Sequence, residues 1–269
     1  MDDAATRRHW PLVLGTVVLV LLAGIGLGAV GLWLAIDNGA SIGREPRSQA
    51  RSFDGAAEDG YAVWDRNEDG EPVRWDACEP IELVLAPQRW PAGARDDLEA
   101  AAETISRASG LELTIAGETD ERPSDARLPY QPTRYGRRWA PVLVAWASPG
   151  EAGLPLRDVD RGVAVPVAVG PPGERSFVSG QVVFNADHDG LVAGGDDRRD
   201  SWRATMVHEL GHLVGLDHVD DEAELMSTHP GEGPIELGAG DRRGLAAIGA
   251  ERGCRPAPPP RPVEVTPAD

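Results

Sequence analysis

The segment HELGHLVGLDH constrains this chain more than any other part of its sequence. His208 and His212 are four residues apart, so on an α-helix they lie on one face, where two imidazole nitrogens can hold one metal ion. Glu209 lies about 100° around that helix and flanks the metal without ligating it. Gly215 suits the end of the helix because glycine enters the left-handed conformation cheaply, and the chain can then turn to bring His218 back as a third ligand. Three protein ligands leave the fourth position of a zinc ion open for water, which is the catalytic arrangement.

The spacing H-E-x-x-H-x-x-G-x-x-H is the signature of the metzincins, which also carry a methionine turn downstream. Met226 lies eight residues past His218, in the segment ELMST. On these residues the chain resembles the metzincin-clan zinc metalloproteases and is most similar to matrixin-type catalytic domains of bacterial, membrane-anchored proteins. The resemblance covers roughly residues 73–254 and is strongest at 201–227.

The resemblance implies an α+β fold of the zincin type. We expect a twisted, mostly parallel sheet with an antiparallel edge strand, an active-site helix, a Met-turn with Met226 under the histidines, and a C-terminal helix. It also implies an endopeptidase in which a zinc-activated water attacks a peptide bond. Glu209 would serve that reaction as general base and then as general acid. The alternative is a non-catalytic, zinc-stabilised binding module at the cell surface, although such a module would not need the carboxylate of Glu209.

Several polar residues near the motif have open roles. Asp217 and Glu224 are candidate hydrogen-bond partners of the histidine rings. His229 is a candidate ligand or transition-state donor, or else a plain surface histidine. By analogy to matrixins His188 could belong to a structural metal site, but no companion histidines lie near it in the sequence.

Residues 11–36 contain no charged residue and are long enough to cross a bilayer, so we expect one transmembrane signal-anchor helix there, after a cytoplasmic segment at 1–10. No cleavage site of the kind that follows a signal peptide is evident. Residues 37–60 read as a flexible stalk, 61–254 as the metalloprotease domain, and 255–269 as a disordered, proline-rich tail.

The two cysteines, Cys78 and Cys254, lie near the two ends of the expected domain. A disulfide between them is plausible only outside the cytoplasm, so we place the catalytic domain there; two free thiols are the alternative. The formal net charge of −18 argues against nucleic acid as a partner. We therefore expect a monomer, held in the cell membrane through residues 11–36, with a protein or peptide substrate.

A second metal site is suggested by one acidic turn. Pro72 and the strand-like flanks suit an acidic hairpin of two short strands better than a helix-loop-helix, but calcium remains the alternative to that interpretation. The residues with the spacing of a calcium-binding loop are Asp65, Asn67, Asp69, Gly70 and Asp76.

Periodicity predicts the remaining elements. Pro166 favours an edge position for its strand, because proline cannot donate to a ladder, and an edge strand could pair with an extended substrate. The alternative is that Pro166 simply ends the strand. Asp200 or Ser201 should cap the motif helix, and Asp241 a final helix that ends near Ala250. Strands are expected at 81–85, 111–116, 141–146, 162–167 and 180–184, and helices at 92–108 and 202–214.

Overall fold

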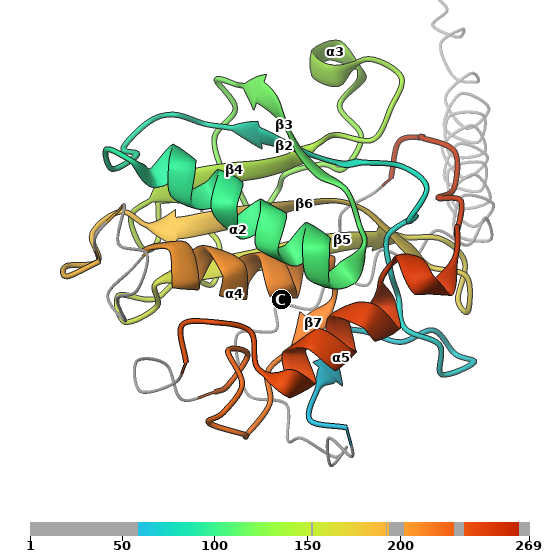
Figure 1. Cartoon of the computed structure of the whole chain (residues 1–269). Coiled ribbons are helices and arrows are strands. Elements are labelled where there is room, and N and C mark those ends of the chain that lie inside the picture. The colour runs from blue at the N-terminus through green and yellow to red at the C-terminus, as the bar shows by residue number, and fades with distance from the viewer. Residues whose placement is uncertain (1–58, 152, 192, 194–201, 229–233, 264–269) are drawn as a thin grey trace, which may run out of the picture. The chain divides into compact units, whose positions relative to one another are not determined.

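A five-stranded mixed sheet, in the order β3-β2-β4-β6-β5, forms the centre of the fold (Figure 1). The computed structural model describes residues 59–263 except 152, 192, 194–201 and 229–233. Four strands are parallel, and only β5 runs antiparallel, to its neighbour β6. This is the expected α+β sheet with one antiparallel edge strand. The strands are β2 (Ile81–Leu85), β3 (Leu113–Glu118), β4 (Val142–Ala147), β5 (Gly162–Val169) and β6 (Ser176–Asn185).

The inner strands β4 and β6 are buried along their whole length. Such strands need apolar residues on both faces, which is why the run PVLVAW predicted a central strand. The edge strand β5 continues through Pro166, which lies opposite Gly180 in the register of β6. The expectation of an edge strand is confirmed, and the alternative that Pro166 ends it is wrong.

Two helices, α2 (Ala94–Ser109) and α4 (Trp202–Val214), lie across one face of this sheet (Figure 1). Both occupy the predicted positions, and Gly110 ends α2 with a φ of +72°. An ion pair of 3.0 Å between Arg203 Nη2 and Asp97 Oδ1 joins the first turns of the two helices. The short helix α3 (Pro132–Tyr135) lies between β3 and β4, and α5 (Ala239–Ile248) and the 3₁₀ helix η1 (Ala250–Arg252) close the fold.

The N-terminal part of the domain departs from prediction. Instead of a hairpin, β1 (Ala62–Val63) pairs antiparallel with β7 (Leu216–Asp217), which lies directly after α4. The acidic turn exists, but its arms meet only at the bridge between Arg66 and Pro72. The pairing partner of β1 is more than 150 residues away, so local patterning could not reveal it.

The acidic turn is held by protein contacts. Arg175 donates to both carboxylate oxygens of Asp65, at 2.6 and 3.1 Å, and its backbone exchanges hydrogen bonds with the Asn67 side chain. Asp69 accepts the backbone N–H of Glu71, and Asp76 that of Cys78. Within the described ranges Asp65 and Asp69 belong to no group that could hold an ion, and Asp76 gathers with Cys78 and Cys254, whose sulfurs form a disulfide, so the calcium alternative gains no support here.

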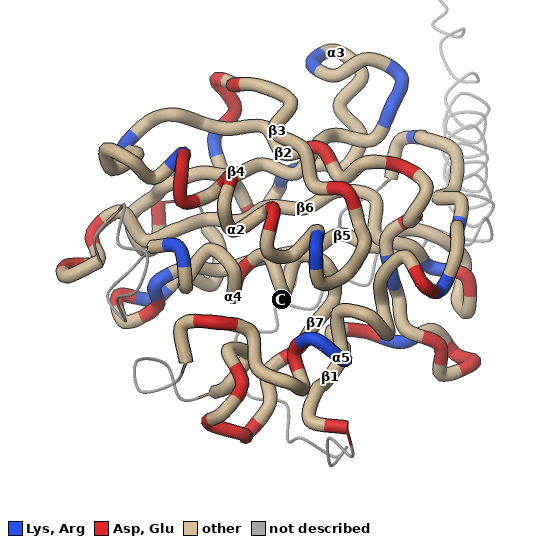
Figure 2. The backbone as a smooth tube through the Cα atoms, viewed as in Figure 1, with Lys and Arg blue, Asp and Glu red and all other residues tan. Residues whose placement is uncertain are grey.

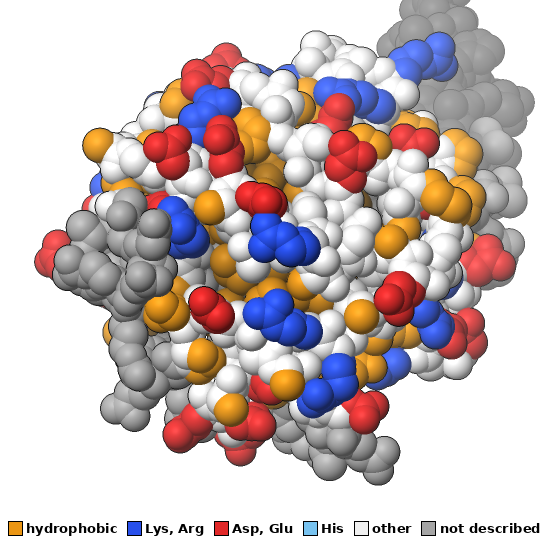
Figure 3. Space-filling model, viewed as in Figure 1, with side chains coloured by type: hydrophobic (Ala, Val, Ile, Leu, Met, Phe, Trp, Pro, Cys, Tyr) orange, Lys and Arg blue, Asp and Glu red, His pale blue; other side chains and the backbone are white. Residues whose placement is uncertain are grey.

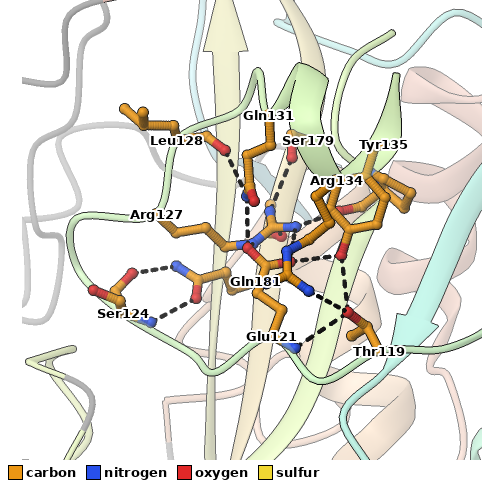
Figure 4. A network of polar contacts seen from close by, with 12 residues as sticks. Thr119, Glu121, Ser124, Arg127, Leu128, Gln131, Arg134, Tyr135, Ser179 and Gln181 are labelled. Carbon is orange, nitrogen blue, oxygen red and sulfur yellow. Dashed lines mark hydrogen bonds and ion pairs between the residues drawn. The ribbon is translucent and has the colours of Figure 1, made fainter. Parts of the chain in front are cut away.

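A buried polar network covers the sheet face opposite α2 and α4 (Figure 4). Its centre is Arg127, whose guanidinium pairs with Glu121 at 3.0 and 3.1 Å. The same guanidinium donates to Ser179 Oγ and to the carbonyl oxygens of Gly180 and Pro141. These bonds fasten the segment 119–141 to the starts of β4 and β6.

The two cysteines form the predicted disulfide, with Cα atoms 5.2 Å apart, which joins the two ends of the domain. The tail was expected to be disordered from residue 255. Its described part, 255–263, has no helix or strand but is anchored, because Trp139 Nε1 donates to the carbonyl of Pro258 at 2.9 Å and Val263 packs in a cluster with β5 and β6. Proline-rich composition predicted the lack of regular structure correctly but could not show these tertiary contacts.

The predicted segments 1–10 and 11–36, nearly all of the stalk at 37–60, and the capping residues Asp200 and Ser201 lie outside the described residues. In the part of the chain that the structure does describe, no helix has the length and apolar character needed to span a bilayer. Basic and acidic positions are interspersed along the backbone in the view of Figure 2, and the surface in Figure 3 mixes both signs of charge with small apolar patches.

Candidate metal centre

The motif lies on α4, which is fixed from several sides. Leu210, Leu213 and Val214 are fully buried. The indole Nε1 of Trp75 donates to the carbonyl of Leu213 at 2.9 Å, which satisfies one of the free carbonyls at the helix end. The histidines therefore stand on a rigid support.

Three histidine side chains converge beside α4. The Nε2 atom of His212 lies 3.1 Å from that of His208 and 3.1 Å from that of His218, and the remaining pair of Nε2 atoms is 3.2 Å apart. Nitrogen ligands about 2.0–2.1 Å from a tetrahedral zinc ion are about 3.3 Å apart. The spacing of the three nitrogens therefore fits zinc.

The hydrogen bonds of the rings also favour a cation between them. His208 Nδ1 lies 2.8 Å from the carbonyl oxygen of Leu225, and His212 Nδ1 lies 3.0 Å from that of Leu216. A carbonyl oxygen only accepts, so each Nδ1 carries the proton and each Nε2 of a neutral ring keeps a lone pair. Lone pairs that face each other at about 3 Å repel one another, and a metal ion between them removes that repulsion.

Burial keeps these rings neutral. It lowers the pKa of His208 to about 4, with the neighbouring His218 acting in the same direction. Burial and then the other two rings place the pKa of His212 well below its ordinary value, and burial also lowers that of His218. Neutral imidazole is the form that ligates metals, so the cluster is ready for an ion at neutral pH.

Two glycines allow the motif to close. A Cβ atom on Gly211 would lie 2.8 Å from Met226 Sδ, so the methionine packs directly against the helix backbone below the histidines. Gly215 follows α4 with a φ of +120°, which side-chain-bearing residues rarely adopt. Gly215 was predicted as the turn residue, whereas the role of Gly211 was missed, because the sequence does not show which side chain approaches it.

Glu224 and Asp241 hold the methionine turn to α5. Both oxygens of Glu224 accept backbone N–H groups in the first turn of α5, each at 2.8 Å. Asp241 accepts the backbone N–H groups of Leu225 and Met226, and also that of Gly238 at 2.8 Å. Glu224 is therefore a helix cap and not a partner of the histidine rings, and Asp241 is the third residue of α5 rather than its cap.

The other candidates have different places. The partners of the His208 and His212 rings are backbone carbonyls, and Asp217 accepts the backbone N–H of His218 at 2.8 Å. His188 is outside the histidine cluster, and its buried Nδ1 has no hydrogen-bond partner among the described residues. His229 lies outside the described residues.

Glu209 is buried between α4 and the first residues of β5. A Cβ atom on Gly162 would lie 2.9 Å from Glu209 Cγ, so only glycine leaves room for this side chain. Burial first, and then the negative charge of Asp160, raise the pKa of Glu209 to about 8, although a hydrogen bond from the Ala164 backbone acts against them. Like that hydrogen bond, a dication in the histidine cluster would favour the charged form of the Glu209 carboxylate and so lower its pKa.

The register of β5 shows which of its peptide groups face outward. Asn185 N–H donates to the carbonyl of Arg161 at 2.9 Å, which makes this pair a hydrogen-bonded one. Since such pairs alternate along an antiparallel ladder, the peptide groups of Gly162, Ala164 and Pro166 point away from β6. The edge therefore offers the carbonyls of all three residues but only the N–H of Gly162, because Pro166 has none and the N–H of Ala164 donates to Glu209.

Asn185 also fixes the chain that leads into this edge. Its side-chain amide donates to the carbonyls of Asp158 and Asp160, at 3.3 and 2.9 Å, and its Oδ1 accepts the N–H of Asp187. Its place at the end of β6 was the only sequence signal, and that signal does not reveal these partners.

Because three neutral rings converge on one point and leave a position free, the fold and site place this protein among the zinc-dependent metallopeptidases. Comparison with family models adds that residues 158–248 match the matrixin family model. The chain carries a matrixin metalloprotease domain with a zinc-binding triad of His208, His212 and His218, which confirms the predicted enzyme class. A comparison with curated proteins gave no match.

Proposed function

We propose that this protein is a membrane-anchored zinc endopeptidase that acts outside the cytoplasm, with Glu209 as its general base and general acid. The observation that carries the proposal is the position of the Glu209 carboxylate, between the helix of the zinc ligands and the edge strand β5. Glu209 follows the zinc ligand His208 directly and packs against Gly162 of that edge, so its carboxylate can serve a peptide that pairs there.

The residues of the chain divide the reaction between them. His208, His212 and His218 would hold the zinc ion, which when bound would supply a water of lowered pKa and a Lewis acid for the scissile carbonyl. The edge of β5 binds and straightens the substrate backbone, while burial around Glu209 excludes other water. Glu209 accepts the proton of the attacking water and returns it to the nitrogen of the leaving amine, so no covalent intermediate with the protein is needed.

Glu209→Gln tests the assigned base. This variant should lose at least about a thousandfold in kcat on an unfolded protein substrate and still bind one zinc per chain, because the amide cannot take the proton. His212→Ala should lose both activity and zinc. The matched control is Glu222→Gln, an exposed residue that should leave both unchanged. Cleavage by Glu209→Gln at the wild-type rate would overturn the role of Glu209.

The membrane anchor and the location rest on sequence and on the disulfide. Residues 11–36 are uncharged, and the bond between Cys78 and Cys254 favours an oxidising compartment. The full chain should stay in the membrane pellet after carbonate extraction, whereas a variant without residues 11–36 should be soluble, and protease added to intact cells should remove the catalytic domain. Full chain found in the soluble fraction would rule out the anchor.

A further inference from the structure

The strand β1 is paired with the stretch between the second and third zinc ligands. Ala62 lies opposite Asp217, and Val63 lies opposite Leu216, which places β1 beside the chain that leads to His218. One residue further on, the backbone N–H of Trp64 donates to the carbonyl of Gly215 at 2.8 Å. The turn that closes the zinc site is therefore bonded to a segment from the start of the domain.

The side chain of Trp64 extends this contact to the metal ligands. Its ring lies 5.4 Å from the ring of His212, centroid to centroid, with an angle of 63° between the planes. This edge-to-face arrangement is favourable between aromatic rings and restricts the rotation of the histidine. Trp64 and the carbonyl of Leu216 thus fix the His212 ring from two directions.

His218 depends on its backbone more than the other two ligands do. The rings of His208 and His212 are each held through Nδ1 by a carbonyl oxygen. Across the described ranges, the ring of His218 has no such bond, and its contacts are to the other two ligands. Its position is set by β7 on one side and, on the other, by Val219 N–H, which donates to the carbonyl of Met226 at 2.9 Å.

We infer that residues 62–64 are a positioning segment of the zinc site: β1 places the backbone of the third ligand, and the Trp64 ring orients the second. The inference rests on the zinc centre of the proposed enzyme but adds residues that lie outside the histidine motif and outside the matched segment 158–248. Outer partners of metal ligands typically change metal affinity by about 10–100-fold when they are removed.

Zinc affinity measured by competition with a chromogenic chelator tests the role of Trp64 apart from catalysis. Trp64→Leu should weaken zinc binding by about tenfold, and Trp64→Phe, which keeps a ring beside His212, should restore most of the affinity. The matched control is Trp139→Leu, because Trp139 is also partly buried and makes an edge-to-face contact, with Tyr130, on the other side of the sheet.

A pair of proline variants tests the backbone contact. The hydrogen-bonded pair of Trp64 with Gly215 implies that the N–H of Ala62 points toward β7 and that of Val63 points away. Ala62→Pro should therefore weaken zinc binding by about tenfold, whereas Val63→Pro should have a smaller effect. Thermal unfolding in excess chelator shows whether each variant is folded before zinc is added.

The outcomes separate the two proposals. If the wild-type protein binds no zinc, the proposed function fails. If the wild-type protein binds zinc and folded Trp64→Leu and Ala62→Pro bind it as tightly as Trp139→Leu and Val63→Pro do, the positioning role of residues 62–64 is overturned while the enzyme assignment stands.

Discussion

Two buried polar clusters lie on opposite faces of the same sheet, and they are satisfied in different ways. Around Arg127, donors meet acceptors and the positive charge meets the carboxylate of Glu121 (Figure 4). In the histidine cluster, three Nε2 atoms face one another within 3.2 Å, and those of His208 and His212 both carry lone pairs because their Nδ1 atoms hold the protons. The first cluster is complete without a ligand, whereas the second presents lone pairs that suit a cation.

The comparison shows how to tell a binding site from a structural network. Burial and polarity are common to both clusters, so neither property identifies a site. The distinguishing feature is the balance of donors, acceptors and charge among the residues themselves. Removal of the Arg127 charge, of the metal or of the Glu121 charge should therefore affect the two clusters differently.

Removal of the charge at the centre of the network should have the largest effect on stability. The Arg127 side chain is only 3% exposed, so Arg127→Met leaves Glu121 buried and unpaired and should lower the free energy of unfolding by about 3–5 kcal/mol. Urea unfolding with saturating zinc measures this change. Zinc affinity should stay at the wild-type value, because no zinc ligand contacts the network.

An exposed ion pair provides the control for this change. Arg107 pairs with Glu103 at 2.6 Å but is 70% exposed, so Arg107→Met should cost less than about 0.5 kcal/mol. The double variant of Arg127→Met with Glu121→Leu should recover much of the loss, because no buried charge remains. A cost for Arg127→Met no greater than that for Arg107→Met would contradict this account of the network.

Zinc removal should affect the histidine cluster alone. A ligand that binds only the folded state adds about 2.7 kcal/mol when its free concentration is a hundred times its dissociation constant. Chelation should therefore lower the melting temperature of the wild-type protein and of Arg127→Met by similar shifts, measured by calorimetry. In His212→Ala the shift should be absent, and a full shift in that variant would place the stabilising ion elsewhere.

A fall in pH should weaken the network and thereby produce the smallest effect. Burial alone would raise the pKa of Glu121, but the ion pair with Arg127 and hydrogen bonds from Arg127, Tyr135 and Gln131 together hold it below its ordinary value. A carboxyl with a lowered pKa in the folded state contributes stability that is complete above the ordinary pKa near 4.5 and is lost as pH falls through the lowered value.

The measurement compares wild type with Glu121→Gln by urea unfolding in chelator, at about pH 7 and about pH 3.5. The wild-type protein should be the more stable at the higher pH, and the difference should shrink at the lower one. A difference that is the same at both values would mean that the charge of Glu121 contributes nothing.

Local patterns predicted the parts of the fold that local physics decides. The helix Trp202–Val214 has the predicted bounds. Its apolar residues face the sheet, and Gly215 adopts the positive φ that ends it. The central strand β4 was recognised from its apolar run, and the three zinc ligands from their spacing. The disulfide followed from the positions of its two cysteines at the ends of the domain.

The missed features are contacts between distant residues. The partner of β1 follows α4, and a buried arginine such as Arg127 looks like any surface charge until its partners are known. The Glu224 carboxylate accepts the N–H of Asp241, and the Asp241 carboxylate accepts the N–H of Leu225, across the gap between the methionine turn and α5, which no periodicity reveals. Sequence located the ligands but not the residues that hold them in place.

The outward peptide groups of β5 have a consequence for which proteins this enzyme can attack. Residues two apart on a strand are about 6.8 Å apart, so the edge accepts only a stretch of chain pulled nearly straight. In a helix or a tight turn, the N–H and C=O groups are hydrogen-bonded within the segment itself, so none is free at that interval. Recognition through this edge would discriminate by conformation before side chains matter, so that natively folded proteins would be spared and loosened linkers or denatured proteins cut.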